Sequence, residues 1–157
     1  MKIGLLSDSH GNIQYVKNAG QYLKDTAKVD LIAHLGDEDG DADVLEGLGI
    51  EILKISGIFS ASYQDPSLPS RIVKEIDGTK VMFTHSPELS AKDLRQIKAV
   101  FYGHTHISKI EDKNGVLWVN PGHLCEAGRK DNPASFAVAV IESGKASAKI
   151  IKYSSIL

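Results

Sequence analysis

The sequence predicts an α/β fold in which two mixed β-sheets pack face to face and helices cover their outer sides. Two observations lead to this prediction. The first third of the 157-residue chain alternates short apolar runs with amphipathic stretches, which is typical of βαβαβ order. The rest consists mainly of paired apolar runs joined by Asp-Gly, Asn-Gly or Ser-Gly, which are turn dipeptides. No linker or repeat divides the two parts, so we expect one domain over residues 1–157.

The first third is predicted to hold three buried strands and two helices. The strands are the apolar runs at residues 2–7, 30–36 and 50–57. The first helix, over residues 12–27, follows from apolar side chains that recur near the helical spacing. The second, over residues 42–49, ends at a glycine, which is common at helix C-termini.

The rest of the chain is predicted to be rich in hairpins. Residues 58–70 are polar, contain two prolines and are expected to form a loop. Three hairpins are predicted, over residues 71–85, 108–122 and 135–153. A further helix over residues 90–97 is expected to lead into a strand at residues 99–103.

Composition and charge exclude several classes of protein. The net charge is −2, from 18 basic and 20 acidic residues, which gives no electrostatic reason to expect nucleic acid or a membrane surface as partner. Cys125 is the only cysteine, so neither an internal disulfide nor a thiolate metal cage is expected. The chain turns polar by Ser7, too early for a signal peptide, and its longest apolar run is too short to span a bilayer. We therefore expect a cytoplasmic protein.

Side chains with metal-ligand chemistry follow the apolar runs, where predicted strands end. Because the carboxyl ends of parallel strands meet at one edge of a sheet, groups far apart in sequence are expected to lie together there. The set comprises Asp8, His10, Asp37, His85, His104 and His106.

Carboxylates and imidazoles together are a ligand set for manganese, iron, zinc, cobalt or nickel. Six such groups exceed the needs of one tetrahedral ion and suit two ions that share a bridging carboxylate. Such ions lie about 3.5–4 Å apart and clamp the attacking and leaving oxygens of a phosphoryl centre. Asp37 is the best candidate for the bridge, because the preceding glycine lets the backbone turn tightly.

Each motif alone has an ordinary structural explanation. The sequence Asp-x-His is weak evidence for a site, Leu-Gly-Asp can be a turn with a helix cap, and a lone His85 can be a core or surface histidine. Gly-His-Thr-His is more specific, because alternation places both rings on one face of an extended segment. The order of these motifs, each after an apolar run, is hard to obtain by chance.

The chain resembles the calcineurin-like metallophosphoesterases, and within them the small prokaryotic phosphodiesterase (YfcE-like) branch. The resemblance rests on SDSHGN (7–12), HLGD (34–37), TKVMFTH (79–85), YGHTH (102–106), VNPG (119–122) and NPASFAVAVIE (132–142). It covers nearly the whole chain. It implies a four-layer αββα sandwich and a metal-dependent phosphoesterase, most simply a phosphodiesterase, that acts on small phosphodiesters or phosphomonoesters.

The resemblance also implies the role of each ligand. Asp8, His10 and His106 would hold one ion, His85 and His104 would help to hold a second, and Asp37 would bridge them. Two divalent ions are implied, manganese first, with iron, zinc, nickel or cobalt as alternatives. A metal-bridging hydroxide would attack phosphorus in line, so that Asp37 and His104 belong to the catalytic centre.

The sequence departs from the family after its third strand. Ile58 stands where relatives have a metal-binding asparagine, Phe59 where many have a histidine that can protonate the leaving group, and Ser60 where an acid is usual. Water, or a serine such as Ser60 or Ser62, could fill the second metal site, or only the first ion binds well. The alternative function is therefore a catalytically weak or inactive member that acts as a protein-interaction scaffold, like the retromer subunit of this fold. That function predicts a large exposed apolar patch away from the ligands.

Other residues near these motifs have two explanations each. His34 is expected to make a core or supporting hydrogen bond, and His123 to be a solvated loop histidine rather than a group at the mouth of the site. The acidic run at residues 37–43 is a solvated helix start, or one of Glu38, Asp39 and Asp41 completes the second metal site. Arg129 and Lys130 lie in a polar loop or meet the substrate phosphate. A homo-oligomer is left open.

Overall fold

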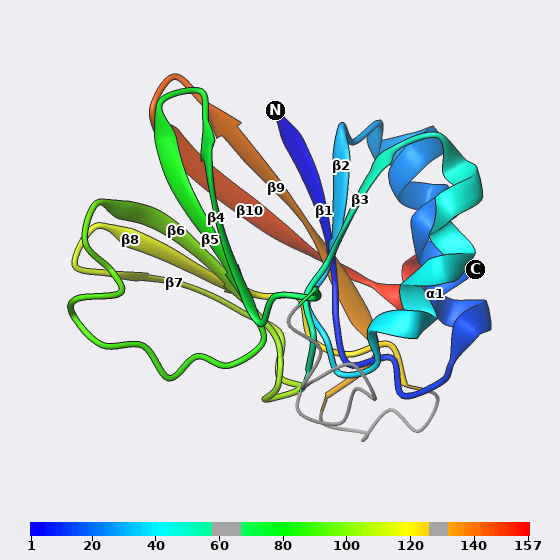
Figure 1. The fold of residues 1–157 in the computed structure, drawn as a ribbon. Helices are drawn as coiled ribbons and strands as arrows, with labels where there is room; N and C mark the ends of the chain where they lie inside the picture. Colours follow the sequence, from blue (N-terminus) through cyan, green and yellow to red (C-terminus); the bar gives the residue numbers. More distant parts are fainter. Residues whose placement is uncertain (58–66, 126–131) are drawn as a thin grey trace.

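The computed structural model describes residues 1–57, 67–125 and 132–157, which form two five-stranded β-sheets (Figure 1). The first sheet has the order β10-β9-β1-β2-β3, and the second has the order β4-β5-β6-β8-β7. The strands of the first sheet are β1 (Lys2–Leu6), β2 (Leu31–His34), β3 (Glu51–Lys54), β9 (Ser135–Glu142) and β10 (Lys145–Lys152). Those of the second are β4 (Arg71–Ile76), β5 (Thr79–Thr84), β6 (Ile97–Tyr102), β7 (Lys109–Lys113) and β8 (Val116–Asn120).

Both sheets are mixed, as predicted, and each contains parallel neighbours at its centre. β1, β2 and β3 run parallel, and β9 pairs antiparallel with β1. In the second sheet β5, β6 and β8 run parallel, while β4 and β7 pair antiparallel at the edges. The parallel strands bring several carboxyl ends to one edge of the molecule, which is where a site is expected.

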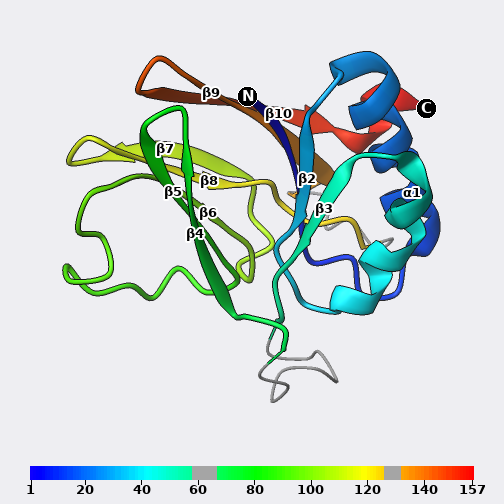
Figure 2. The same ribbon diagram turned by 45° about the horizontal axis from the view of Figure 1, so that its top comes forward.

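The helical segments cover the outer face of the first sheet (Figures 1 and 2). α1 (Ile13–Tyr22) begins after Asn12, whose side chain accepts a hydrogen bond from the Tyr15 amide, and it continues as the π-helical turn η1 (Leu23–Ala27). The second predicted helix is present as the 3₁₀ helix η2 (Asp39–Leu48), which begins three residues earlier than expected. A short 3₁₀ helix, η3 (Tyr153–Ile156), follows β10.

Alternate residues of the central strands form the core between the two sheets. Ile3 and Leu5 of β1 point into it, as do Phe83 of β5 and Phe101 of β6, whose rings meet edge to face with centroids 5.4 Å apart. Leu6 points the other way, into a second apolar cluster between the first sheet and the helices. Burying such a side chain stabilises the fold by about 2 kcal/mol, so the two faces of β1 fix its position between both layers.

The helix predicted over residues 90–97 is not present, and β6 begins at Ile97, two residues before the predicted strand. Hydrogen bonds between Ser90 and Asp93 begin one helical turn. The chain then leaves the turn at Gln96, which has a φ of +65°, and pairs with β5. The strand pairing therefore overrides the helical pattern, and a turn-rich segment, rather than a helix, packs Leu89 and Leu94 against the outer face of the second sheet.

All three predicted hairpin turns are confirmed. Both central residues of each turn have positive φ, as two-residue hairpins of type I′ require. The turns are Asp77-Gly78 between β4 and β5, Asn114-Gly115 between β7 and β8, and Ser143-Gly144 between β9 and β10. Among the described residues, no helix is both long enough and apolar enough to cross a membrane.

Candidate metal centre

The predicted ligands come from four strand ends that belong to both sheets. Asp8 and His10 follow β1, Asp37 follows β2, His85 directly follows β5, and His104 and His106 follow β6. The structure gathers ligand atoms of Asp8, His10, Asp37 and His106 within 4.8 Å of one another. His85 and His104 lie beside this group, with their rings 5.1 Å apart and His85 next to Asp37. The six side chains thus form one neighbourhood.

Two histidines and two carboxylates make the tightest part of the centre. The Nε2 atoms of His10 and His106 lie 3.1 Å apart. His10 Nε2 is 2.8 Å from Asp37 Oδ2, and His106 Nε2 is 3.2 Å from Asp8 Oδ1. Nitrogen and oxygen lone pairs therefore converge on one point, as the ligands of a transition-metal ion do.

Asp37 lies between this group and His85. Its Oδ2 faces His10, whereas its Oδ1 is 3.4 Å from His85 Nε2. The Nδ1 of His85 is 2.8 Å from the Leu35 carbonyl oxygen, to which it donates, so in neutral His85 the lone pair is on Nε2. Each oxygen of Asp37 thus faces a different set of imidazoles, which is the geometry of a bridging carboxylate.

Three buried atoms at this point make no hydrogen bond within the described part of the chain. They are Asp8 Oδ1, Asp37 Oδ1 and His85 Nε2. A buried polar atom without a partner costs about 1–3 kcal/mol, and more when it carries charge, so such atoms rarely persist without a role. Divalent cations take oxygen and nitrogen lone pairs of this kind, and the residues present fit such an ion.

The backbone around the ligands is strained. Asp8, His10, His104 and His106 all have positive φ, between 47° and 68°. Such values are uncommon for residues other than glycine, and they concentrate at functional sites. Backbone hydrogen bonds hold the conformation: the Asp8 amide donates to the Gly36 carbonyl, and the His104 amide donates to Asp8 Oδ2.

Close packing at Gly103 is required for the two sheets to share the centre. A Cβ atom on Gly103 would lie 2.0 Å from Ser7 Oγ and 2.9 Å from Asp8 Oδ2. Ser7 Oγ itself donates to Asp8 Oδ2 at 2.6 Å. Only glycine therefore lets the end of β6 approach the end of β1 this closely.

A buried network supports the loop that carries Asp8 and His10. Asp41 Oδ2 accepts hydrogen bonds from Ser9 Oγ at 2.7 Å and from the Gly11 amide at 2.8 Å. His34 Nε2 lies 3.0 Å from Ser9 Oγ, which confirms the prediction of a supporting hydrogen bond for His34. Through these contacts Asp41 holds the loop that carries Asp8 and His10.

Burial and charge set the protonation of three of these groups. Burial lowers the pKa of His34 to about 4, although Asp41 and other carboxylates oppose the shift. Burial alone would raise the pKa of Asp37, but its interactions with His85 and His10 outweigh that effect and lower it. For His85, burial acts against protonation, whereas the Asp37 carboxylate and the Leu35 carbonyl prevail and raise the pKa.

A family model described as "Calcineurin-like phosphoesterase superfamily domain" matches residues 1–144. The chain belongs to the calcineurin-like phosphoesterase superfamily. Among its relatives, phosphodiesterase MJ0936 of Methanocaldococcus jannaschii is 29% identical over 143 residues, which cover 80% of this chain and 85% of the relative.

Solved structures with the calcineurin-like fold match nearly the whole chain. A novel archaeal phosphodiesterase aligns with a TM-score of 0.76 at 24% identity, over 96% of this chain and all of the other. YfcE, a phosphoesterase from E. coli, aligns with a TM-score of 0.69 at 18% identity, over 98% of this chain and all of YfcE. The predicted fold class and the predicted membership of the calcineurin-like family are confirmed.

Two residues of this calcineurin-like domain, Asn120 and Asp41, hold the ligand loops in place and were not predicted from the sequence. The side-chain nitrogen of Asn120, at the end of β8, donates to the Gly103 carbonyl at 2.8 Å and lies 3.0 Å from Thr105 Oγ1. It thereby fixes the loop that carries His104 and His106. Only its place in the quoted VNPG motif could have indicated this role. Asp41 could be found only as part of an acidic run.

The prediction that His123 is a solvated loop histidine is wrong. It is 3% exposed, its Nε2 lies 2.8 Å from the Asn132 carbonyl, and its ring centroid is 5.9 Å from that of His106. Its Nδ1 is 3.0 Å from Cys125 Sγ. The start of β9 packs against residues 123–125, with the Ser135 amide donating to the His123 carbonyl, and this tertiary contact buries the ring.

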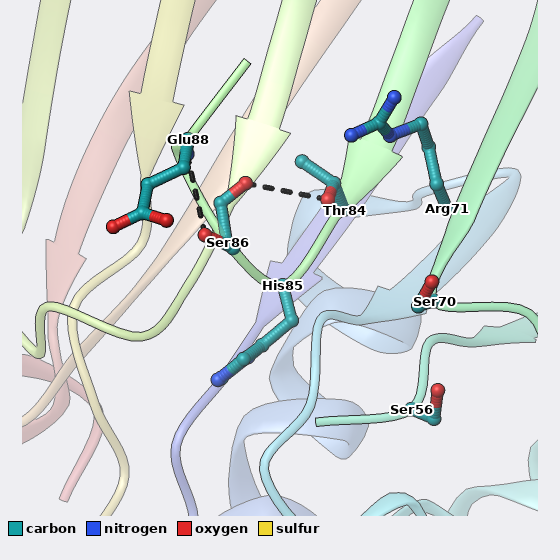
Figure 3. Close-up of a pocket in the computed structure, with 7 residues that line it drawn as sticks. All are labelled: Ser56, Ser70, Arg71, Thr84, His85, Ser86 and Glu88. Carbon is teal, nitrogen blue, oxygen red and sulfur yellow. Dashed lines mark hydrogen bonds between the residues drawn. The ribbon is translucent and has the colours of Figure 1, made fainter. Parts of the chain in front are cut away.

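His85 also lines a cavity of about 530 Å³ next to the centre (Figure 3). Hydroxyl and charged side chains surround it, from the end of β3, the start of β4 and the segment after β5. The predicted departures at Ile58, Phe59, Ser60 and Ser62, and the basic pair Arg129 and Lys130, lie outside the described residues.

Proposed function

We propose that this chain is a metal-dependent hydrolase of small phosphate esters, in the first place phosphodiesters. The observation that carries the proposal is the convergence of two buried carboxylates, each with an oxygen that makes no hydrogen bond, on three imidazoles at one point between the two sheets. Family membership and the phosphodiesterase name of the relative MJ0936 agree with it.

The same geometry supports the proposed metal ligands. One ion would be held by Asp8, His10 and His106, with Asp37 Oδ2 facing it. A second would be held by His85 and His104, with Asp37 Oδ1 facing it. Manganese is proposed first, with iron, zinc, nickel or cobalt as alternatives, because nitrogen and oxygen ligands suit all of them. When bound, such ions act as Lewis acids toward water and the phosphoryl group.

The charges of the protein itself explain why a cation is needed. Asp8 and Asp37 are almost completely buried, and the pKa of Asp37 is lowered, so this carboxyl is ionised near neutral pH. The buried negative charge of Asp37 would repel a phosphate anion, whereas the same group neutralised by cations would admit it.

His104 is a proposed ligand of the second ion and belongs to the proposed catalytic centre. Its backbone amide is anchored on Asp8 Oδ2 at 3.0 Å, while its side chain is exposed and lies against His85. The anchored backbone would hold the ring in place for an ion beside His85, and the exposure of the ring leaves that ion within reach of substrate.

Metal analysis and a turnover assay test the proposal. Purified protein should bind divalent metal and hydrolyse a bis-aryl phosphodiester faster with added Mn²⁺. Asp37→Asn should lower the rate by at least about 100-fold, since the bridging charge is lost. Asp43→Asn, which changes an exposed aspartate on η2, is the matched control and should stay within about twofold of the unaltered protein. Turnover that needs no metal, or that survives Asp37→Asn, would refute the proposal.

The second candidate is a weak or inactive member that acts as a scaffold. It is favoured by the sequence departure at Ile58 and Phe59. The Ile58→Asn variant separates the two candidates, because it restores the amide that relatives use. A large gain in metal-stimulated rate would show that the missing amide limits catalysis, whereas efficient hydrolysis by the unaltered chain would rule out the scaffold as the main function.

A further inference from the structure

The cavity beside the metal centre has walls with an unusual chemistry. Every described residue that lines it carries a hydroxyl, a charge or an imidazole. The set comprises Ser56, Ser70, Arg71, Thr84, His85, Ser86 and Glu88. In Figure 3, Ser56 and Ser70 lie on one side of His85, and Ser86 and Glu88 lie on the other. An occupant of the cavity therefore meets a hydrogen-bonding group on each of these side chains, beside the aliphatic parts that carry them.

The cavity and the metal centre share His85. This residue lines the cavity, and its Nε2 atom lies 3.4 Å from the Asp37 carboxylate. A phosphate held at the centre would therefore extend one of its ester groups along His85 into the cavity. The occupant of the cavity is then the alcohol portion of the substrate, and this step rests on the proposed phosphoesterase function.

The charges in the walls exclude a second anion or an ammonium group as the preferred occupant. Arg71 is already paired, with its Nη1 atom 2.6 Å from Asp93 Oδ1. Hydrogen bonds from Ser90, and then the Arg71 guanidinium, lower the pKa of Asp93 to about 2, so this partner stays charged. Arg71 would attract an anion but Glu88 would repel it, and the reverse holds for an ammonium group, so the walls favour neither sign of charge.

A hydroxyl group can use both kinds of wall, because it donates to a carboxylate and accepts from a guanidinium. The local hydrogen bonds of Ser86 and Thr84 also leave hydrogen-bonding groups available to an occupant of the cavity. Ser86 Oγ accepts from the Glu88 amide at 3.2 Å, which leaves its O–H to donate. Thr84 Oγ1 donates to the Ser86 carbonyl at 3.3 Å, which leaves its lone pairs to accept.

From these contacts we propose that the cavity is the subsite for a polyhydroxylated alcohol carried by the substrate phosphate, of the glycerol or ribose kind. Phosphodiesters of such alcohols are then the preferred substrate class. Diesters of simple alkyl or aryl alcohols are turned over, but without the contribution of the cavity.

A pair of matched substrates tests this subsite. Glyceryl 4-nitrophenyl phosphate and propyl 4-nitrophenyl phosphate share a leaving group and differ by two hydroxyls. With Mn²⁺-loaded protein, kcat/KM for the glyceryl ester should exceed that for the propyl ester by about tenfold or more, as two hydrogen bonds in a partly closed site allow. A ratio near one, with both esters hydrolysed, would overturn the subsite and leave the phosphoesterase function intact.

Variants of the cavity wall locate the effect. The double variant Ser70→Ala/Glu88→Ala should lower turnover of the glyceryl ester more than that of the propyl ester, so that their ratio falls toward one. Ser147→Ala/Glu75→Ala changes the same residue types at exposed positions on β10 and β4, outside the cavity, and should keep the ratio of the unaltered protein. An unchanged ratio in the cavity variant would contradict the assignment.

Calorimetric titration separates this inference from the proposed function. Zn²⁺-loaded protein is titrated with glycerol 1-phosphate and with propyl phosphate, and the former should bind about tenfold more tightly. If neither ester is hydrolysed but glycerol 1-phosphate keeps this advantage, the subsite stands and the hydrolase proposal fails. Equal affinity of the two phosphates would overturn the subsite whatever the turnover shows.

Discussion

Replacing His34 by glutamine should remove a pH-dependent part of the stability. His34 is fully buried, with its Nε2 atom 3.0 Å from Ser9 Oγ, and burial lowers its pKa to about 4. The folded protein therefore keeps His34 neutral at pH values where the unfolded chain, with a pKa of 6.5, binds a proton. Glutamine keeps an N–H donor for Ser9 but cannot titrate.

The size of the effect follows from the two pKa values. As the pH falls below 6.5, protons bind the unfolded state, and the free energy of unfolding decreases until the folded His34 is protonated near pH 4. Each pKa unit is worth about 1.4 kcal/mol, so the full loss is about 3 kcal/mol. At pH 5 the loss of unfolding free energy has reached about 2 kcal/mol, and above about pH 7.5 there is no loss.

Urea denaturation in the presence of a chelator measures this contribution without interference from metal binding. The free energy of unfolding is determined at about pH 7.5 and pH 5 for the unaltered protein and for His34→Gln. Carboxylates that titrate in this range act equally in both proteins, so their effect cancels in the difference. The variant should lose about 2 kcal/mol less than the unaltered protein. A difference between the two proteins that is the same at both pH values would refute the reasoning.

Three further predictions concern the metal centre. Gly103→Ala forces a Cβ to within 2.0 Å of Ser7 Oγ, so the free energy of unfolding in urea should fall by about 2 kcal/mol or more. Calorimetry should also show weaker metal binding, and an unchanged metal affinity would contradict the packing argument. Asp41→Ala removes the acceptor of Ser9 Oγ and should reduce metal affinity about tenfold, whereas Asp41→Asn should restore part of that affinity. Equal affinities in the unaltered protein and both variants would argue against a positioning role for Asp41. Removal of metal with a chelator should lower Tm, and Mn²⁺ added at about 100 times its Kd should raise the free energy of unfolding again by about 3 kcal/mol. A Tm that does not respond would mean that no ion binds the folded state selectively.

Local patterns predicted most of the secondary structure. The three hairpins are confirmed at their predicted turns, since Asp-Gly, Asn-Gly and Ser-Gly pairs accept the positive φ values that the turns need. The strands of the first third and the helix after Asn12 follow equally from apolar spacing. The helix expected at residues 90–97 fails because pairing of β6 with β5, a contact between distant residues, prevails over local preference.

Residue types and apolar runs were enough to predict which groups would form the site and that these groups follow strand ends. Asp8, Asp37 and His106 could be named as ligands because carboxylates and imidazoles after apolar runs are typical of sites in α/β sheets. How these groups face one another follows from the packing of the two sheets. The two oxygens of Asp37 point to different imidazoles, and that arrangement depends on the approach of β6 to β1 at Gly103.

The supporting residues were likewise decided by the fold alone. Asp41 stands in an acidic run and Asn120 ends a strand, and neither position indicates locally what its side chain will hold. His123 was expected in solvent and is buried, because residues around Ser135 pack over it. Local sequence sets backbone preference and side-chain chemistry, whereas burial and long-range hydrogen bonds arise only when distant segments meet. Burial and these hydrogen bonds set the pKa values, and they leave the polar atoms without hydrogen bonds on which the proposed function depends.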